Sequence, residues 1–355
     1  MNRRSLLLLF TWTFFLGGTV FPQSLKIDSS LQVQREILDV RVLDVGGNPI
    51  LGLTPNDFQL KIGGDLIPIE ALIWVDPTDS ALDKLHVGLG QEDDGFFDGA
   101  QPGSETTPSG RLITVFIQTE LTGSRIASYL QMPKYMATFF DQLSENDYVA
   151  VYGFGSHLRL YCDFTRDRSV AVDAVQLAAR RSEESAFLAA NSPSLRPFFD
   201  EQKGRDIAKP EDALRSIAKN LANFSGNKTI VYLGYGFGRF SDGNVHMEPE
   251  YRKAVHELNK ARVNVFSIDI TRADYHPLEQ GMRRLAEDTG GTYFSARVFP
   301  ENAVRKVVNA ISGYYRLSFQ MPETIKERSN YRLELKNRKG RLYVRNPYNG
   351  APELR

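Results

Sequence analysis

The sequence predicts an α/β protein with a doubly wound, mostly parallel sheet and a small β-sandwich formed by N- and C-terminal strands. Residues 111–118 read RLITVFIQ, a nearly continuous apolar run that is typical of a strand buried on both faces. Strand and helix patterns then alternate along residues 111–313, as expected of an open sheet covered by helices. The regions before and after carry strand patterns only, which predicts a separate, smaller β structure.

The two terminal regions are expected to fold together. Residues 25–75 alternate apolar and polar side chains, with turns at 46–49 and 63–65 and no helical period. The C-terminal residues 314–355 contain three more strand patterns, at residues 314–320, 331–336 and 341–344. Because so few strands are marginally stable alone, we expect them to pair with the N-terminal strands into one β-sandwich.

The central region, residues 111–313, contains the elements of one α/β domain. Strand patterns occur at residues 111–118, 147–154, 158–164, 228–234, 263–269 and 292–295. Helical periodicity occurs at residues 126–143, 168–181, 210–224, 248–261, 277–289 and 301–312. The short link 155–157 forces its two strands into an antiparallel hairpin, so one edge strand should be antiparallel. Residues 182–206 are weakly periodic and are expected to form an insertion or an irregular crossover.

The first 24 residues have a short basic segment followed by an apolar one, as in a secretory signal peptide. An uncleaved N-terminal anchor is the alternative. We therefore expect a secreted or periplasmic protein with no stable membrane insertion after cleavage. Residues 76–110 are rich in glycine and contain an acidic cluster, which predicts a flexible linker.

Composition excludes some partners. Lys and Arg together number 43, and so do Asp and Glu, so no global field favours nucleic acid and no such partner is expected. The single Cys162 cannot form an internal disulfide. Its place in an apolar strand pattern predicts a buried, inert thiol.

Short motifs occur in a fixed order along most of residues 31–345. They are Val40-x-Val42-x-x-Val45, Gly47-x-Pro49-Ile50-x-Gly52-Leu53, Asp57-Phe58, Asp163-Phe164-Thr165-x-Asp167, Ile268-Asp269 and Tyr314-Tyr315-Arg316-Leu317. In this order they resemble the secreted proteins related to von Willebrand factor type A (VWA), of the acidobacterial type. The resemblance implies a VWA, Rossmann-like fold for residues 111–313. It also implies a metal-ion-dependent adhesion site in the turn after the first strand of that domain.

The chain departs from the family pattern at the positions that would bind the metal. The family turn carries D-x-S-x-S, whereas this chain has Gln118, Glu120 and Thr122 there. Gly234 stands where a further carboxylate is expected. Hard cations need mostly anionic oxygen ligands, so we predict a degenerate site and no metal or other cofactor. The alternative is a Mg²⁺- or Ca²⁺-dependent adhesion domain with remodelled ligands, namely Glu120, Thr122 and Asp269.

Other motifs do not support an enzyme. Gly234-x-Gly236-x-Gly238 follows a strand, but the dinucleotide fingerprint must open directly into a helix, so a tight turn is favoured. His256-Glu257 lacks the second histidine of a zinc-protease motif. The five histidines are scattered, and solvated or capping roles are expected for them. With no catalytic constellation, an enzyme built on the same sheet is the least favoured alternative.

The favoured function is binding of another protein at the carboxyl ends of the sheet strands. Three loops, at residues 118–124, 235–240 and 269–275, should meet at this edge because parallel strands end there together. They carry aromatic and arginine side chains of the types that dominate protein interfaces. The candidate partner-binding residues are Glu120, Thr122, Ser124, Tyr235, Phe237, Arg239, Asp269 and Arg272. The competing interpretation is that the aromatic side chains pack under neighbouring loops.

Overall fold

The computed structural model describes eight segments of the chain. They are residues 35–76, 110–119, 123–186, 193–271, 276–296, 300–321, 331–336 and 340–345. The predicted signal peptide, residues 1–24, lies outside them, as does the predicted linker 76–110 apart from its two end residues. Among the helices in these segments, none is long and apolar enough to cross a membrane.

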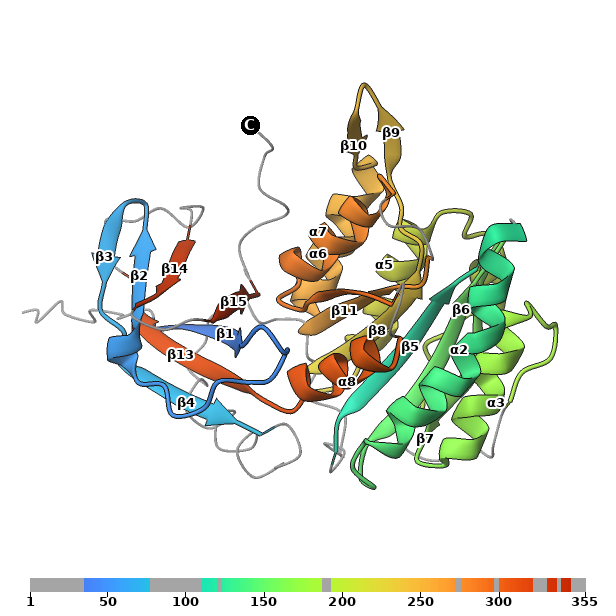
Figure 1. Cartoon of the computed structure of the whole chain (residues 1–355), viewed down its shortest axis with the longest axis horizontal. Helices are drawn as coiled ribbons and strands as arrows, with labels where there is room; N and C mark the ends of the chain where they lie inside the picture. The colour runs from blue at the N-terminus through green and yellow to red at the C-terminus, as the bar shows by residue number, and fades with distance from the viewer. Residues whose placement is uncertain are drawn as a thin grey trace, which may run out of the picture. The chain divides into compact units, whose positions relative to one another are not determined.

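A six-stranded sheet forms the centre of the α/β part (Figure 1). In spatial order its strands are β12 (Tyr293–Ser295), β11 (Val263–Asp269), β8 (Lys228–Gly234), β5 (Leu112–Gln118), β6 (Tyr148–Phe154) and β7 (Leu158–Thr165). Neighbours are parallel except β6 and β7, which confirms the predicted antiparallel edge strand. The strand order reverses between β5 and β8. The carboxyl ends of these two strands and of β11 are called the crest below, and open α/β sheets bind their ligands at such a switch point.

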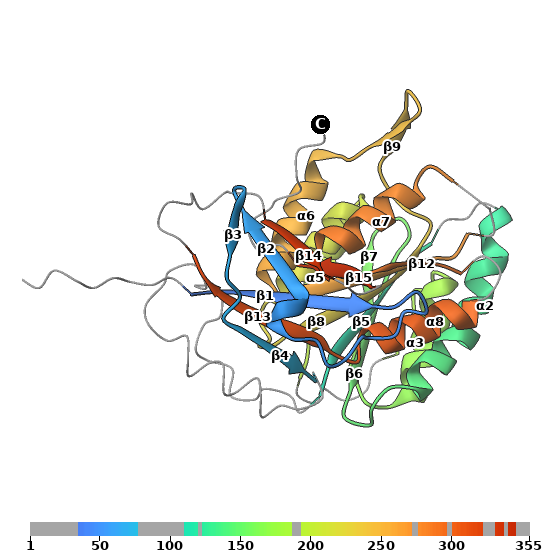
Figure 2. The ribbon, with the colours of Figure 1, turned by 60° about the vertical axis from the view of Figure 1, so that its left-hand side comes forward.

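Helices cover both faces of this sheet (Figures 1 and 2). One face packs against α2 (Gly123–Asp141), α3 (Arg168–Ala179) and α8 (Pro300–Ala310), and the other against α5 (Pro210–Leu221), α6 (Pro249–Lys260) and α7 (Glu279–Asp288). On β5, Ile113, Val115 and Ile117 contact the first layer, while Phe116 contacts the second. A strand with helices on both sides buries both sets of side chains, which explains its continuous apolar run. The predicted α/β fold class is thus confirmed.

Two local elements differ from the prediction. Residues 239–246, expected to be loop, form a hairpin of β9 (Arg239–Ser241) and β10 (Asn244–His246). Its turn residues Asp242 and Gly243 have φ values of 53° and 79°, the left-handed pair that an Asp-Gly turn favours. In the segment predicted to be irregular lies the short helix α4 (Glu201–Arg205), capped by the Asp200 carboxylate.

The N- and C-terminal strands pair as predicted. One sheet has the order β15 (Arg341–Val344), β1 (Arg35–Leu43), β13 (Tyr314–Gln320) and β4 (Ala71–Val75). The other has the order β14 (Tyr331–Leu335), β2 (Phe58–Ile62) and β3 (Asp65–Ile67), and η1 (Pro55–Asp57) precedes β2. Leu38, Leu60 and Leu317, one from each of three strands, are buried in a shared apolar core. The predicted β-sandwich is therefore confirmed.

A buried charged group joins the β-sandwich to residues of the α/β part. The Asp39 carboxylate of β1 accepts hydrogen bonds from Arg316 Nε at 3.0 Å and from Arg345 Nη2. Arg262 Nη2 lies 3.6 Å from the same carboxylate, and Asn227 Nδ2 lies 3.4 Å from it. We call these five residues the Asp39 cluster.

β1 also carries the buried Arg41, which is bonded to backbone carbonyls. Arg41 donates to the carbonyls of Ala310, at 3.2 Å, and Gly290, at 3.1 Å. Its guanidinium lies 5.3 Å from the ring centroid of Phe266 and 5.4 Å from that of Tyr314. Carbonyls and aromatic faces thus replace water around this cation.

The thiol of Cys162 is buried on β7, as predicted. Burial raises the pKa of this thiol to about 12, and the neighbouring Asp163 and Asp167 add to the effect. The neutral thiol is a poor nucleophile, which supports the prediction that it is inert.

Candidate functional site at the crest of the sheet

Two positions at which the VWA resemblance places metal ligands, 118 and 234, carry the uncharged residues Gln118 and Gly234. Gln118 ends β5 and is 3% exposed. Its Nε2 donates to the Gly236 carbonyl at 3.1 Å, and its Oε1 accepts a hydrogen bond from the Tyr232 hydroxyl. The amide therefore ties the loop after β8 to the end of β5.

Gly234 is required by this packing. A Cβ built at Gly234 would lie 2.7 Å from Gln118 Oε1 and 2.8 Å from the Tyr232 ring. Such contacts are closer than van der Waals packing tolerates, so a larger residue would force the Gln118 and Tyr232 side chains apart. The two positions are thus coupled: glutamine at one and glycine at the other form a single packed unit.

The loop after β8 contains a predicted contact residue, Phe237, that is buried. Phe237 is 4% exposed, and its ring packs against Tyr232 and Tyr251 with centroid distances of 6.2 Å and 5.9 Å. Phe237 is thus buried, as the competing interpretation of these aromatic side chains expects. Gly236 and Gly238, at φ values of 105° and 100°, turn the backbone on either side of it. Tyr235 is half-buried and packs against the opposite core.

Asp269, another predicted contact residue, is also buried, at 2% exposure. Its Oδ1 accepts from the Thr271 backbone N–H at 2.9 Å and the Thr271 hydroxyl at 2.8 Å. Its Oδ2 lies 2.8 Å from His276 Nε2 and accepts from the Tyr293 hydroxyl at 2.9 Å. Burial raises the pKa of this carboxyl, but the hydrogen bonds from His276 and Thr271 outweigh it and lower the pKa. Asp269 is therefore an ionised, internally bonded group rather than an exposed contact.

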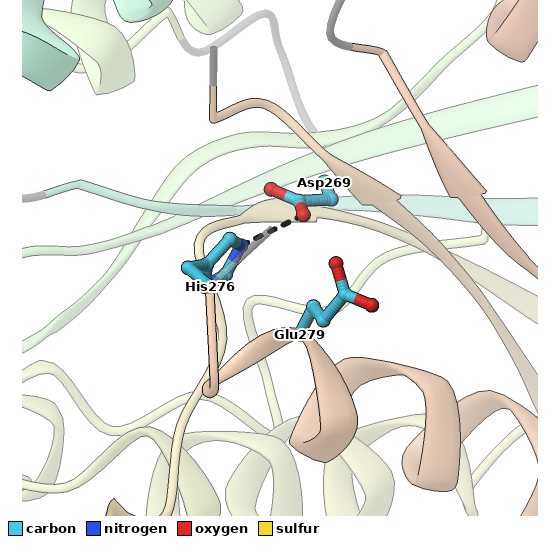
Figure 3. Close-up of side chains that lie close together, drawn as sticks. All are labelled: Asp269, His276 and Glu279. Carbon is cyan, nitrogen blue, oxygen red and sulfur yellow. Dashed lines mark hydrogen bonds and ion pairs between the residues drawn. The ribbon is translucent and has the colours of Figure 1, made fainter. Parts of the chain in front are cut away.

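Glu279 brings a second carboxylate to this place from the first turn of α7 (Figure 3). Its Oε2 lies 3.5 Å from the Tyr293 hydroxyl, and its Oε1 accepts from Arg283 Nη2 at 3.3 Å. The Arg283 guanidinium lies 4.3 Å from the centroid of the Tyr293 ring. Burial raises the pKa of Tyr293, and the nearby Asp269 carboxylate raises it further. The hydroxyl therefore stays protonated and can donate a hydrogen bond.

Three ionisable side chains thus converge at the crest. Ligand atoms of Asp269, His276 and Glu279 all lie within 4.8 Å of one another. Glu279, Arg283 and Tyr293 also line a cavity of about 580 Å³. We call Asp269, His276 and Glu279 the crest triad. Such a set can bridge hydrogen bonds or coordinate a cation.

His276 and Glu279 were not among the candidate site residues predicted from the sequence. His276 was expected to be solvated or to cap a helix, whereas its ring faces Asp269. One signal was present: a carboxylate at a strand end, followed seven residues later by H-x-x-E where a helix begins. Three other predicted residues, Glu120, Thr122 and Arg272, lie outside the described segments. Ser124 is described only as part of the α2 backbone.

Arg239 and Phe240 lie on the β9–β10 hairpin, which extends from the crest side of the sheet (Figure 1). Phe240 is 51% exposed, and Arg239 is exposed as well. These strands pair with each other and with no other described strand. Arg239 is therefore accessible, as its predicted role requires.

No family model matches the chain, and no curated protein matches it in sequence. Several solved structures are similar to part of it. An aerotolerance-related membrane protein from Bacteroides fragilis NCTC 9343, with multiple mutations to serines, has 14% identity and a TM-score of 0.37, covering 56% of this chain and 98% of that one. A von Willebrand factor type A protein from Catenulispora acidiphila has 13% identity and a TM-score of 0.38, covering 66% and 64%. The manganese-loaded TRAP protein of Plasmodium vivax has 11% identity and a TM-score of 0.35, covering 63% and 92%. Similarities of this size carry no conclusion about what this chain binds.

Proposed function

We propose that the chain is a non-enzymatic protein-binding module, secreted or periplasmic, that holds another protein at the crest side of its α/β sheet. The observation that carries the proposal is Phe240, an aromatic side chain 51% exposed on the β9–β10 hairpin. Arg239 is exposed beside it, and aromatic and arginine residues contribute most of the free energy of many protein interfaces. The hairpin presents both on a backbone that its Asp242-Gly243 turn holds in shape.

The packing of the crest supports binding through side chains rather than through a metal of the adhesion-site kind. Gln118 uses both atoms of its amide in hydrogen bonds to Tyr232 and Gly236. Gly234 has no space for a carboxylate while that packing holds. The partner surface therefore consists of the exposed hairpin and the loops near it, with the buried Gln118 and Phe237 as its support.

We expect a photo-crosslinking amino acid at position 240 to capture a discrete partner in the producing cells. The same amino acid at Leu66 is the control, because Leu66 is 61% exposed but lies on β3 of the β-sandwich. With the captured protein purified, Phe240→Ala should weaken binding about 30-fold, the equivalent of about 2 kcal/mol for an interface hot spot. The melting temperature of this variant should stay nearly unchanged because the Phe240 side chain is exposed. Equal capture at both positions, or undiminished binding by a folded Phe240→Ala variant, would contradict the proposal.

We also predict no tight binding of Mg²⁺ or Ca²⁺. The crest carries Gln118 and Gly234 at two of the positions where a carboxylate would dehydrate a hard cation. Calorimetric titration of the purified protein with either ion at physiological concentration should show no saturable heat. A saturable signal that disappears in Glu120→Ala would instead favour the metal-dependent adhesion domain with Glu120, Thr122 and Asp269 as ligands.

A further inference from the structure

We propose that the crest triad, Asp269, His276 and Glu279, is a binding site for one divalent transition-metal ion such as Zn²⁺. The three residues come from the end of β11, the loop before α7 and the first turn of α7, and their side chains point toward one another (Figure 3). The ligand set contains none of the residues at positions 118, 120, 122 and 234, and it shares only Asp269 with the remodelled adhesion site of the alternative. The inference does not depend on the proposed protein partner.

The chemistry of the set selects the class of metal. One imidazole with two carboxylates suits zinc and its first-row neighbours, whereas Mg²⁺ and Ca²⁺ prefer all-oxygen sites. Asp269 and Glu279 place two carboxylates close together at a largely buried position. A divalent cation would balance both charges. Three protein ligands leave a fourth coordination position for water. One of the ligands, Glu279, lines a cavity.

Neighbouring groups hold two of the ligands in place. Both oxygens of Asp269 are oriented by hydrogen bonds, one from Thr271 and one from the Tyr293 hydroxyl. Tyr293 also lies 3.5 Å from Glu279 Oε2, so one hydroxyl contacts both carboxylates. Such outer groups orient ligands in natural metal sites.

Only one of the two ring nitrogens of His276 has a hydrogen-bond partner among the described residues. His276 Nε2 is bonded to Asp269, but Nδ1 is buried and has no partner among the described residues. Nε2 is the ring nitrogen that faces Asp269, so an ion bound there would leave Nδ1 as it is, and Nδ1 does not distinguish a metal site from a purely structural one. The competing interpretation is a metal-free Asp269–His276 pair, in which a proton occupies the place of the ion.

The ion requires a small adjustment of the present geometry. Tetrahedral zinc with bonds near 2.0–2.1 Å separates its ligand atoms by about 3.3 Å. His276 Nε2 and Asp269 Oδ2, now 2.8 Å apart, would separate slightly, while Glu279 would move inward. The Glu279 side chain is 18% exposed, and its carboxylate contacts Arg283 at 3.3 Å and the Tyr293 hydroxyl at 3.5 Å. Rotation of this side chain would bring it toward the ion.

The test is a titration of the untagged, metal-free protein with Zn²⁺, followed by Co²⁺ as a spectroscopic probe. We expect one saturable Zn²⁺ site and a visible Co²⁺ absorption band that Zn²⁺ abolishes. His276→Ala and Glu279→Gln should each weaken Zn²⁺ binding at least about tenfold. His256→Ala, an exposed histidine on α6, is the matched control and should bind as the unchanged protein does.

Two outcomes would overturn the proposal. One is the absence of a saturable Zn²⁺ signal in the unchanged protein. The other is equal weakening by His256→Ala and His276→Ala, which would indicate adventitious binding to surface histidines. Glu279→Gln keeps the side-chain shape, so it decides the result if melting shows that His276→Ala does not fold. Because the titration uses the metal alone, its failure leaves the crosslinking test of the protein partner unaffected.

Discussion

Replacing Asp39 with alanine is expected to lower the free energy of unfolding by about 3–5 kcal/mol, as found when one partner of a buried ion pair is removed. Asp39 is the carboxylate shared by Arg316, Arg345 and Arg262. Arg316 and Arg345 are buried, so without Asp39 their charges would lie close together and uncompensated. Urea denaturation measures the change. Asp65→Ala, at an exposed position on β3, is the control and should change the free energy by less than about 0.5 kcal/mol.

The same carboxylate predicts a dependence on pH. Burial raises the pKa of Asp39, but Arg345, Arg316 and Arg262 outweigh it and hold the pKa well below its usual range. A lowered folded-state pKa contributes stability that is present above the unfolded value of about 3.9 and is lost as pH falls toward the folded value. The stability gap between the unchanged protein and Asp39→Asn, which removes the charge but keeps the shape, should therefore shrink below about pH 4. A gap that stays constant from pH 7 to pH 3 would contradict this account.

Removing residues 314–355 is expected to unfold the β-sandwich while the α/β part survives. β13 lies between β1 and β4 in its sheet. Its loss would therefore leave these two N-terminal strands without the strand that joins them. β14 pairs with β2 in the second sheet, and Leu317 and Phe319 of β13 lie in the apolar core between the sheets. Limited proteolysis should then cut residues 35–75 rapidly, and mass spectrometry would locate the sites.

A shorter truncation is the matched control for this experiment. Ending the chain after Arg345 keeps β13, β14 and β15 together with the Arg345 contact to Asp39. This variant should resist protease in the N-terminal strands as the full chain does. Unchanged protection after removal of residues 314–355 would show that the N-terminal strands fold without their C-terminal partners.

The crest shows where prediction from sequence fails. Phe237 and the exposed Phe240 belong to one set of aromatic residues in the sequence, and their residue type does not show which of them is buried. The difference arises because glycines with positive φ flank Phe237, whereas Phe240 lies on a hairpin that extends from the crest side of the sheet. The Asp242-Gly243 pair was a readable signal for that hairpin. Asp269 likewise was identified as a strand-end carboxylate, but its burial depends on His276, Thr271 and Tyr293 around it.

By itself, the sequence determined the features that depend on neighbouring residues. Apolar runs and helical spacing define the alternation of strands and helices, and the short link 155–157 defines the antiparallel edge strand, because these patterns act over a few residues. Only the tertiary structure decided which polar groups meet. Asp39 and Arg345 are far apart in the chain, and the Tyr293 hydroxyl that contacts Asp269 comes from β12, which follows α7 in the chain. Such contacts follow from the packing of whole elements, which no local spacing of residues encodes.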